Sequence, residues 1–212
     1  MGHSHRSAVG RQLLSSVMIG LAIVAFVTVG CAKETRVTRV DTGLVTDLSG
    51  RWNDTDSQQV AETMVKEALG YPWLDNYVKS KGHQPVVVVG TVLNRSHEHI
   101  DTQTFITDLE RELTNSQKVT FVAGKGERDE LREERREQAV HAREDTQRAA
   151  GKEIGADYMM KGNISTILDE VDGTKAIFYQ VDLELIDLES NVKTWYGQKK
   201  IKKVVERKRM LF

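Results

Sequence analysis

The chain has 212 residues, of which 39% are apolar and 29% are charged, and its formal net charge is −1. This length suits one domain with a targeting segment. The near balance of 30 basic and 31 acidic residues excludes a global basic field of the kind that binds nucleic acid. A single cysteine excludes an intrachain disulfide and a thiolate zinc site, so packing alone must hold the domain together.

The first 30 residues have the parts of a secretory signal. Arg6 and Arg11 precede an uncharged, largely apolar run from Leu13 to Gly30. After the lone Cys31 and one alanine comes a charged pair, Lys33-Glu34. The run of about 18 residues also suits an uncleaved membrane anchor. A third alternative makes Cys31 an ordinary small hydrophobic residue.

The letters "VTVGCAK" (27–33) resemble a bacterial lipoprotein box, in which small residues precede a cysteine that is acylated and becomes the new N-terminus. Gly30 fits this pattern, whereas Thr28 stands where an aliphatic residue is usual. The resemblance implies a lipid on Cys31. Ala32, in place of the aspartate that marks inner-membrane retention, implies the outer membrane, facing the periplasm. We therefore predict a signal peptide over 1–30 and a lipidated tether over 31–46 that reaches at most ~50 Å.

The next segment predicts an amphipathic helix that ends at Leu69. Asn53 and its neighbours offer N-caps, and Thr55 with Gln58 has capping-box spacing. Gly70 and the proline that follows it at 72 end the apolar period.

Helices and strands then alternate. Residues 73–80 predict a short second helix, and the β-branched run over 85–94 predicts a buried strand. An amphipathic helix follows over 102–114, capped by Asp101 or by the threonine after it. Residues 118–123 predict a second short strand.

Charge dominates residues 127–154, which predict a solvent-exposed helix with ion pairs three residues apart. We expect this helix to break near residues 144–146, to restart there and to dock its second half on the domain. A helix that binds a partner is the alternative.

The last third of the chain turns to period two. Residues 158–164 and 181–185 alternate apolar with polar side chains, and a phase shift at Ile186 indicates a bulge or a strand end. Hairpin turns are predicted at 171–175 and 188–193, with a last strand over 192–201.

Together these elements predict an α/β domain over residues 47–205, with a mixed, mostly antiparallel sheet of about four to five strands and helices packed on it. A basic tail follows over 206–212. The lysines of "KKIKKVVERKRM" suit an edge strand protected from pairing. The alternative is attraction to an anionic membrane or to lipopolysaccharide phosphates, which salt would weaken.

Candidate chemistry is sparse. His97, His99 and Asp101 alternate on a loop and could converge on zinc or nickel, which would make the protein a metal-dependent enzyme. The alternative is a polar loop in which Asp101 caps the following helix. The sequence contains neither a nucleophile elbow nor a phosphate-binding loop, so we expect no catalytic activity, no cofactor and no small-molecule substrate.

Several strings resemble the LpoB-type penicillin-binding-protein activators, a family of outer-membrane lipoproteins. These are "DLSGRWNDTDS", "VVVVGTVLNRSHEHID", "FITDLERELTNSQKVTFV", "GKEIGADYMMKGNIS" and "YQVDLELIDLESNVKTWYGQKKIKK", which cover most of residues 44–203. The resemblance implies a fold like the N-terminal domain of TolB. It also implies a non-catalytic role, in which the domain docks on a class A, bifunctional penicillin-binding protein and stimulates glycan polymerisation and cross-linking. The best-known members carry a long disordered linker, whereas the tether here is short.

Exposed and unusually placed side chains are the candidates for partner contact: Arg51, Trp52, Asn94 and Arg95. Trp52 has two interpretations, as a staple-like contact with its own domain or as a protruding aromatic anchor for a partner. The alternative function is a structural or assembly lipoprotein of an outer-membrane complex with a TolB-like or curli-secretion-like fold.

Overall fold

The computed structural model describes residues 38–41, 44–171 and 173–206. The predicted signal peptide, Cys31 and the tail beyond Glu206 lie outside the described residues. A compact unit spans Gly43–Phe212, and the helices and strands described below all belong to it.

Two helices open the fold. α2 (Asp54–Leu69) begins after Asn53, and the Asn53 and Asp56 side chains each accept the other's backbone N–H at 3.0 Å. The predicted capping pair of Thr55 and Gln58 is therefore wrong, because the helix starts two residues earlier. α3 (Pro72–Lys81) confirms the short second helix, and its proline occupies the first turn, where a missing N–H costs nothing.

The middle of the chain adds a strand, a helix and a strand. β1 (Val86–Arg95) and α4 (Thr102–Ser116) confirm the predicted elements, and the Asp101 side chain caps α4 by accepting from the N–H of Gln103 at 2.9 Å. β2 (Thr120–Phe121) is shorter than predicted, because only two residues pair with β1.

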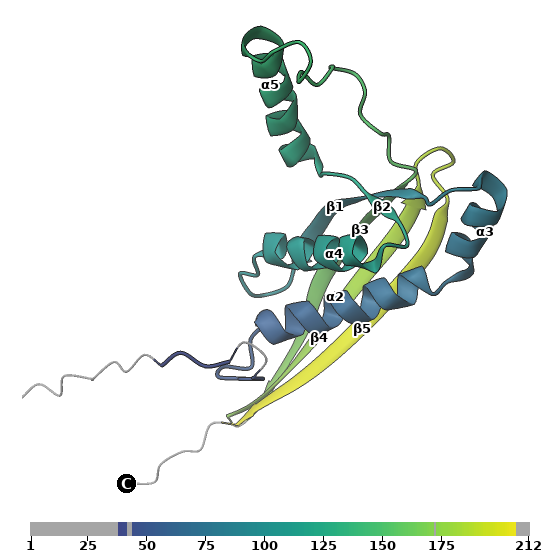
Figure 1. Ribbon diagram of the computed structural model, residues 1–212. Helices are drawn as coiled ribbons and strands as arrows, with labels where there is room; N and C mark the ends of the chain where they lie inside the picture. Colours follow the sequence, from purple (N-terminus) through teal and green to yellow (C-terminus); the bar gives the residue numbers. More distant parts are fainter. Residues whose placement is uncertain (1–37, 42–43, 172, 207–212) are drawn as a thin grey trace, which may run out of the picture. The chain divides into compact units, whose positions relative to one another are not determined.

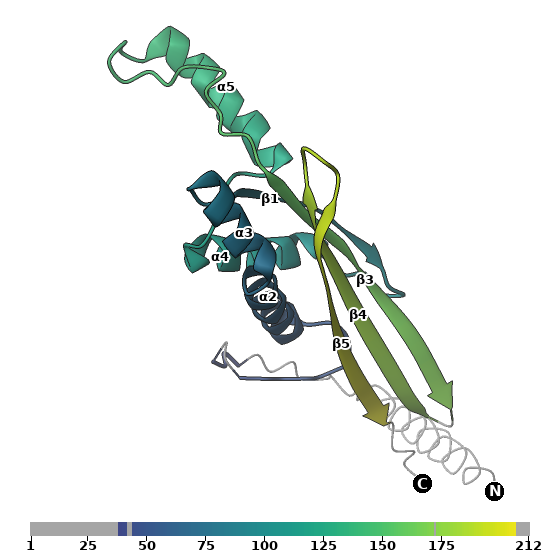
Figure 2. The same cartoon turned by 90° about the vertical axis from the view of Figure 1, so that its right-hand side faces the viewer.

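α5 (Lys125–His141) is the charged helix, and every residue in it stays exposed or half-exposed. The predicted restart is wrong: residues 142–157 form turns and irregular chain that return to the sheet. Figures 1 and 2 show this arm pointing away from the sheet. Glu153 on the returning chain pairs with Arg132 at 2.9 Å and with Arg135 at 2.7 Å. The arm has too few apolar side chains to dock, so ion pairs hold it together instead.

Three long strands complete the sheet: β3 (Tyr158–Val171), β4 (Thr174–Asp187) and β5 (Lys193–Glu206). The order is β2-β1-β3-β4-β5, with β1 parallel to β2 and β3 and the other pairs antiparallel. This confirms the mixed sheet and places β5 at an edge. A register shift between Leu185 and Ile186 confirms the predicted bulge.

One face of the sheet is covered by helices, and the core lies between them (Figures 1 and 2). The largest fully buried side chains come from both layers: Met64, Phe105, Leu109, Leu113, Met160, Ile164, Tyr179, Leu183 and Leu185. Within the described part of the chain, the opposite face carries no helix; we call it the open face. The helices of that part are also too short or too polar for any of them to span a membrane.

Candidate functional site: a groove on the open face of the sheet

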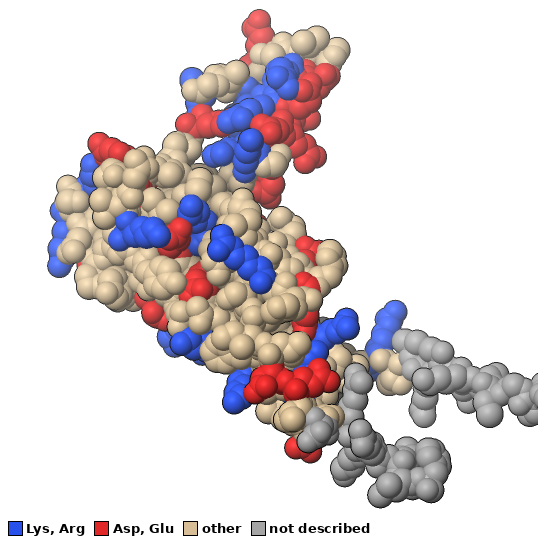
Figure 3. All heavy atoms as spheres, turned by 180° about the vertical axis from the view of Figure 1, so that it is seen from behind, with Lys and Arg blue, Asp and Glu red and all other residues tan. Residues whose placement is uncertain are grey.

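A hollow of about 670 Å³ lies on the open face, across β1, β3, β4 and β5, and Lys125 at the start of α5 also lines it. Successive side chains of a strand point to opposite faces, so residues that alternate with the core line this groove. The side chains that shape it are Leu93, Arg95, Lys161, Asp182, Glu184, Lys193 and Tyr196. In Figure 3, which shows this side of the molecule, cationic side chains gather around a few acidic ones within a largely uncharged surface.

Asp182 is the hub of the groove floor. Its carboxylate accepts from the Gln198 amide at 2.8 Å, from the Gln180 amide at 3.0 Å and from the Asn163 amide at 3.3 Å. Burial acts to raise the pKa of Asp182, but these bonds and one from the Tyr196 hydroxyl outweigh it and lower the pKa below its ordinary value. The floor is therefore a fixed polar network with a stable negative charge.

The rim combines an exposed aromatic ring with charged groups. Tyr196 is 56% exposed and Leu93 is 47% exposed. Glu184 pairs with Lys193 at 2.5 Å and faces Lys161 at 3.6 Å. Exposed aromatic and apolar side chains beside charged groups occur at protein-binding surfaces, where aromatic residues are enriched.

Of the predicted partner-contact residues, Arg95 lines this groove, whereas Asn94 does not. The Asn94 amide donates to the Glu98 carbonyl oxygen at 2.8 Å, and its own carbonyl oxygen accepts from Ser96 N at 2.9 Å. Asn94 thus shapes the loop after β1.

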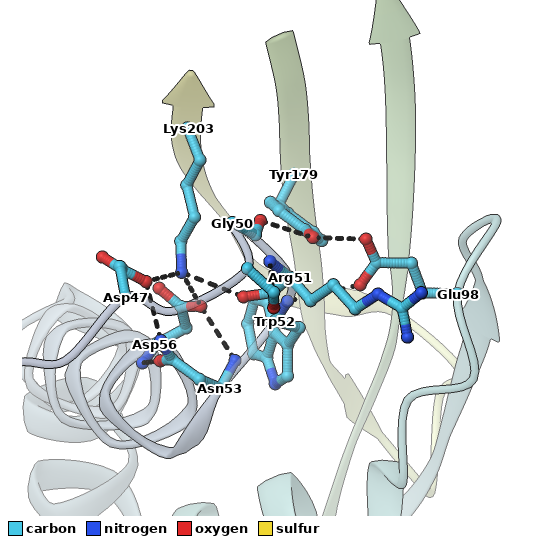
Figure 4. A network of polar contacts seen from close by, with 10 residues as sticks. Asp47, Gly50, Arg51, Trp52, Asn53, Asp56, Glu98, Tyr179 and Lys203 are labelled. Carbon is cyan, nitrogen blue, oxygen red and sulfur yellow. Dashed lines mark hydrogen bonds and ion pairs between the residues drawn. The ribbon is translucent and has the colours of Figure 1, made fainter. Parts of the chain in front are cut away.

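Arg51 and Trp52 lie at the other end of the sheet, in the segment that precedes α2 (Figure 4). The Trp52 ring is half-buried against the core, 6.1 Å from the Phe105 ring and 5.7 Å from the Tyr179 ring between centroids. This confirms the staple-like contact. Arg51 is exposed.

A polar network ties this segment to the sheet, as Figure 4 shows. Lys203 of β5 donates to Asp47 Oδ1 and Asp56 Oδ2, both at 2.6 Å, and to the carbonyl oxygen of Arg51 at 3.1 Å. Tyr179 donates to Glu98 Oε1 at 2.8 Å, with the Gly50 carbonyl oxygen 3.2 Å away. Gly50 has φ +70, and a side chain there would meet Val205.

The predicted metal ligands are not brought together. His97 Nδ1 lies 2.9 Å from the Thr166 hydroxyl, and Asp101 caps α4. Glu98 between them accepts from Trp52 N at 3.3 Å as well as from Tyr179. Among the residues that the structure describes, no group of three or more metal-binding side chains converges. The loop therefore joins β1 to α4 and supports the core.

Comparison of the sequence with known protein families identifies the family of this chain. A model of the family "Peptidoglycan-synthase activator LpoB" matches residues 56–201. The chain belongs to the LpoB family. No curated protein matches the sequence. Among solved structures, the LpoB C-terminal domain from Escherichia coli is 19% identical with a TM-score of 0.42, over 70% of this chain and 99% of that one.

Two further structures are similar. The NMR structure of Escherichia coli LpoB is 15% identical with a TM-score of 0.39, over 85% of this chain and 86% of that one. The LpoB C-terminal domain from Salmonella enterica is 17% identical with a TM-score of 0.32, over 64% of this chain and 94% of that one.

For this LpoB-family chain, the family match spans α2 to most of β5 and includes every strand that lines the groove. Sequence reasoning missed Lys161, Asp182, Glu184 and Tyr196 as surface candidates. The signal was present, because Asp182 and Glu184 alternate with buried Val181, Leu183 and Leu185 and so define an outward face.

Proposed function

We propose that this chain is a lipid-anchored periplasmic regulator that binds and allosterically activates a bifunctional penicillin-binding protein of class A. The observation that carries the proposal is the family match over residues 56–201, because the family is one of peptidoglycan-synthase activators. The anchor is Cys31 in the outer membrane, as the lipoprotein-like box implies. The domain supplies binding energy, and the synthase supplies the chemistry.

The groove on the open face is the proposed docking site for the synthase. A ligand shifts a conformational equilibrium only by its difference in affinity for the two states. The groove must therefore bind the active form of the synthase more tightly than the resting form. Its floor supports this role, since Asp182 and its amide donors are hydrogen-bonded to one another in the domain without a partner.

The test adds purified protein to a glycan-polymerisation assay with each class A synthase of the source organism. Wild-type protein should raise the polymerisation rate. Replacing Tyr196 with alanine or Leu93 with serine should weaken stimulation and binding about tenfold, because both changes remove exposed contact area in the groove. Binding is measured by surface plasmon resonance.

The matched control variants change two exposed residues, one in α3 and one at its N-cap. Tyr71 is 52% exposed and Val78 is 39% exposed, and both are remote from the groove lining. Tyr71→Ala and Val78→Ser should stimulate like the wild type. Absence of stimulation and of binding with every synthase would defeat the proposed function. Equal losses in groove variants and controls would defeat the groove as the docking site.

A further inference from the structure

The end of the sheet where β3 turns into β4 carries exposed apolar side chains. Figures 1 and 2 show the strands continuing past α2 and α4 toward this end. On the open face, Ile167 pairs with Phe178, and the next row places Val204 beside Ala176. Ile167 is 67% exposed, Val204 is 58% exposed, and Val171 at the end of β3 is 67% exposed. Three apolar side chains in water at one end of a sheet require an explanation.

Cations stand beside these apolar groups. Lys200 and Lys202 are exposed on the same face of β5, and the Lys200 ammonium lies 6.0 Å from the centroid of the Phe178 ring. Asp169 and Glu206 share this face. The sequence then continues from Glu206 as "RKRMLF", three cations followed by three apolar residues. Apolar residues bordered by lysine and arginine are typical of surfaces that lie on an anionic bilayer.

Both ends of the described domain meet this end of the sheet. Asp47 and the Arg51 carbonyl group are bound to Lys203 of β5, and Gly50 packs against Val205. The chain from the proposed anchor therefore enters the domain here, and the basic tail leaves from here. A tether of at most ~50 Å cannot take this end far from the lipid.

We propose that the tip patch, made of Ile167, Val171, Phe178, Val204, Lys200 and Lys202, docks on the anionic phospholipid surface of the membrane. The lysines bind lipid phosphate groups, and the apolar side chains enter the interfacial layer. The proposal relies on the anchor proposed above only for its orientation. Tyr196 of the groove and Val204 of the tip patch are eight residues apart on β5, about 26 Å. These two positions can therefore be mutated separately, whereas Lys200 pairs with Gln180 of the groove network.

Vesicle sedimentation tests this directly. Every buried core residue in the described part of the chain lies within Gly43–Phe212, so we expect the unlipidated fragment 32–212 to keep the fold. It should sediment with vesicles containing about 30% phosphatidylglycerol in phosphatidylcholine, but not with phosphatidylcholine alone. Raising NaCl from about 0.05 to 0.5 M should release it. Ile167→Asp/Val204→Asp and Lys200→Glu/Lys202→Glu should each lower the partition coefficient about tenfold or more.

Controls match each change. Val140 is 73% exposed on α5 and Ile154 is 64% exposed on the returning chain, so Val140→Asp/Ile154→Asp adds the same two charges at remote apolar sites. Lys66→Glu/Lys79→Glu reverses two cations on α2 and α3. Both controls should partition like the wild type, and circular dichroism verifies the fold of all variants. Wild-type partition of both tip variants, or binding lost only when residues 207–212 are deleted, would overturn the proposal.

The test of membrane docking can fail or succeed independently of the test of synthase activation. Sedimentation involves no synthase, and synthase stimulation can be measured in detergent without a bilayer. The Ile167→Asp/Val204→Asp variant should stimulate the synthase like the wild type there while losing vesicle binding. Loss of both activities in this variant, when it is well folded, would contradict a separate membrane-docking surface.

Discussion

The position of Lys203 in the sequence predicts a solvent-exposed lysine of an edge strand, but in the structure its side chain is a nearly buried ion-pair partner. Among the lysines of β5 it fits a row that protects an edge strand, and β5 is indeed an edge. Its side chain is only 9% exposed, however, and its three N–H groups meet three acceptors. The partners Asp47 and Asp56 come from some 150 residues earlier in the chain, and so local pattern could not reveal them. Lys203 thus fixes where the N-terminal segment joins the domain.

Replacing Lys203 with methionine should lower the free energy of unfolding by ~2 kcal/mol, because the nearly buried Asp56 carboxylate loses its counter-charge. Half-exposed Asp47 keeps the loss below that of a fully buried pair. Urea denaturation at pH 7 measures the difference. Lys202→Met, on the exposed side of the same strand, should change the free energy by less than ~0.5 kcal/mol. Equal effects of the two variants would mean that the network does not stabilise the fold.

The ion pairs of Lys203 with Asp47 and Asp56 also predict how stability depends on pH. Burial acts to lower the pKa of Lys203, but the bonds to Asp47 and Asp56 prevail and raise it above 10.5. A raised pKa contributes stability that is full below the unfolded value and is lost as pH rises through the folded value. The stability difference between wild type and Lys203→Met should therefore be constant from pH 7 to about pH 9 and shrink above pH 10.5. Urea titrations at several pH values check this, and a difference that instead grew in alkali would contradict it.

Among whole elements, the arm of residues 125–157 differs most from what its sequence predicts. Its charge density correctly indicates an exposed helix, but the scattered alanines and Val140 are too few to bury a second half. Glu153 holds the returning chain instead. Hydrogen bonding from Arg132, strengthened by Arg135, lowers the pKa of Glu153 to about 2 despite opposing desolvation. Ion pairs thus hold the two sides of the arm together, and Asp157 at its end joins it to the sheet by accepting from Val86 N at 2.7 Å.

Deleting the arm should leave the fold intact. Replacing residues 126–152 with about six Gly/Ser residues removes side chains that all lie outside the core. The loop between β2 and β3 then becomes shorter at little entropic cost. We expect Tm to move by less than ~3 °C, measured by calorimetry. Phe105→Ala serves as the contrast, since removing this fully buried ring should cost ~3–5 kcal/mol. Unfolding of the arm deletion would show that the arm contributes to the core.

Regular elements were the predictable part of this molecule. Period-two runs located β3, β4 and β5, and Asp101 marked the start of α4, because these signals act over a few residues. The groove was less accessible to sequence reasoning, since Tyr196 and Asp182 become neighbours only through the register of β4 with β5. Trp52 could be given two interpretations, and only its contacts with Phe105 and Tyr179 decide for the staple.

At the scale of the whole molecule, the two proposed binding surfaces lie at different positions along the sheet. The N-terminal segment meets β5 on the helix-covered face, at the same end of the sheet as the tip patch, while the groove lies farther along the open face. If Cys31 carries lipid, the short tether keeps the tip near the outer membrane, and a synthase partner must come within that reach. The position of the anchor, rather than any catalytic group, then determines where the protein acts.

Cys31→Ser tests that position. Expressed in a Gram-negative bacterium, the wild type should incorporate labelled palmitate and lose residues 1–30, because the acylated cysteine becomes the new N-terminus. The serine variant should take up no label and keep the leader, giving a longer chain by mass spectrometry. Thr28→Leu, which moves the box closer to the usual pattern, should be processed at least as completely as the wild type. Unlabelled wild-type protein of the same length as the serine variant would instead indicate an uncleaved anchor. The apolar run of about 18 residues would then hold the domain at the membrane into which it first inserts.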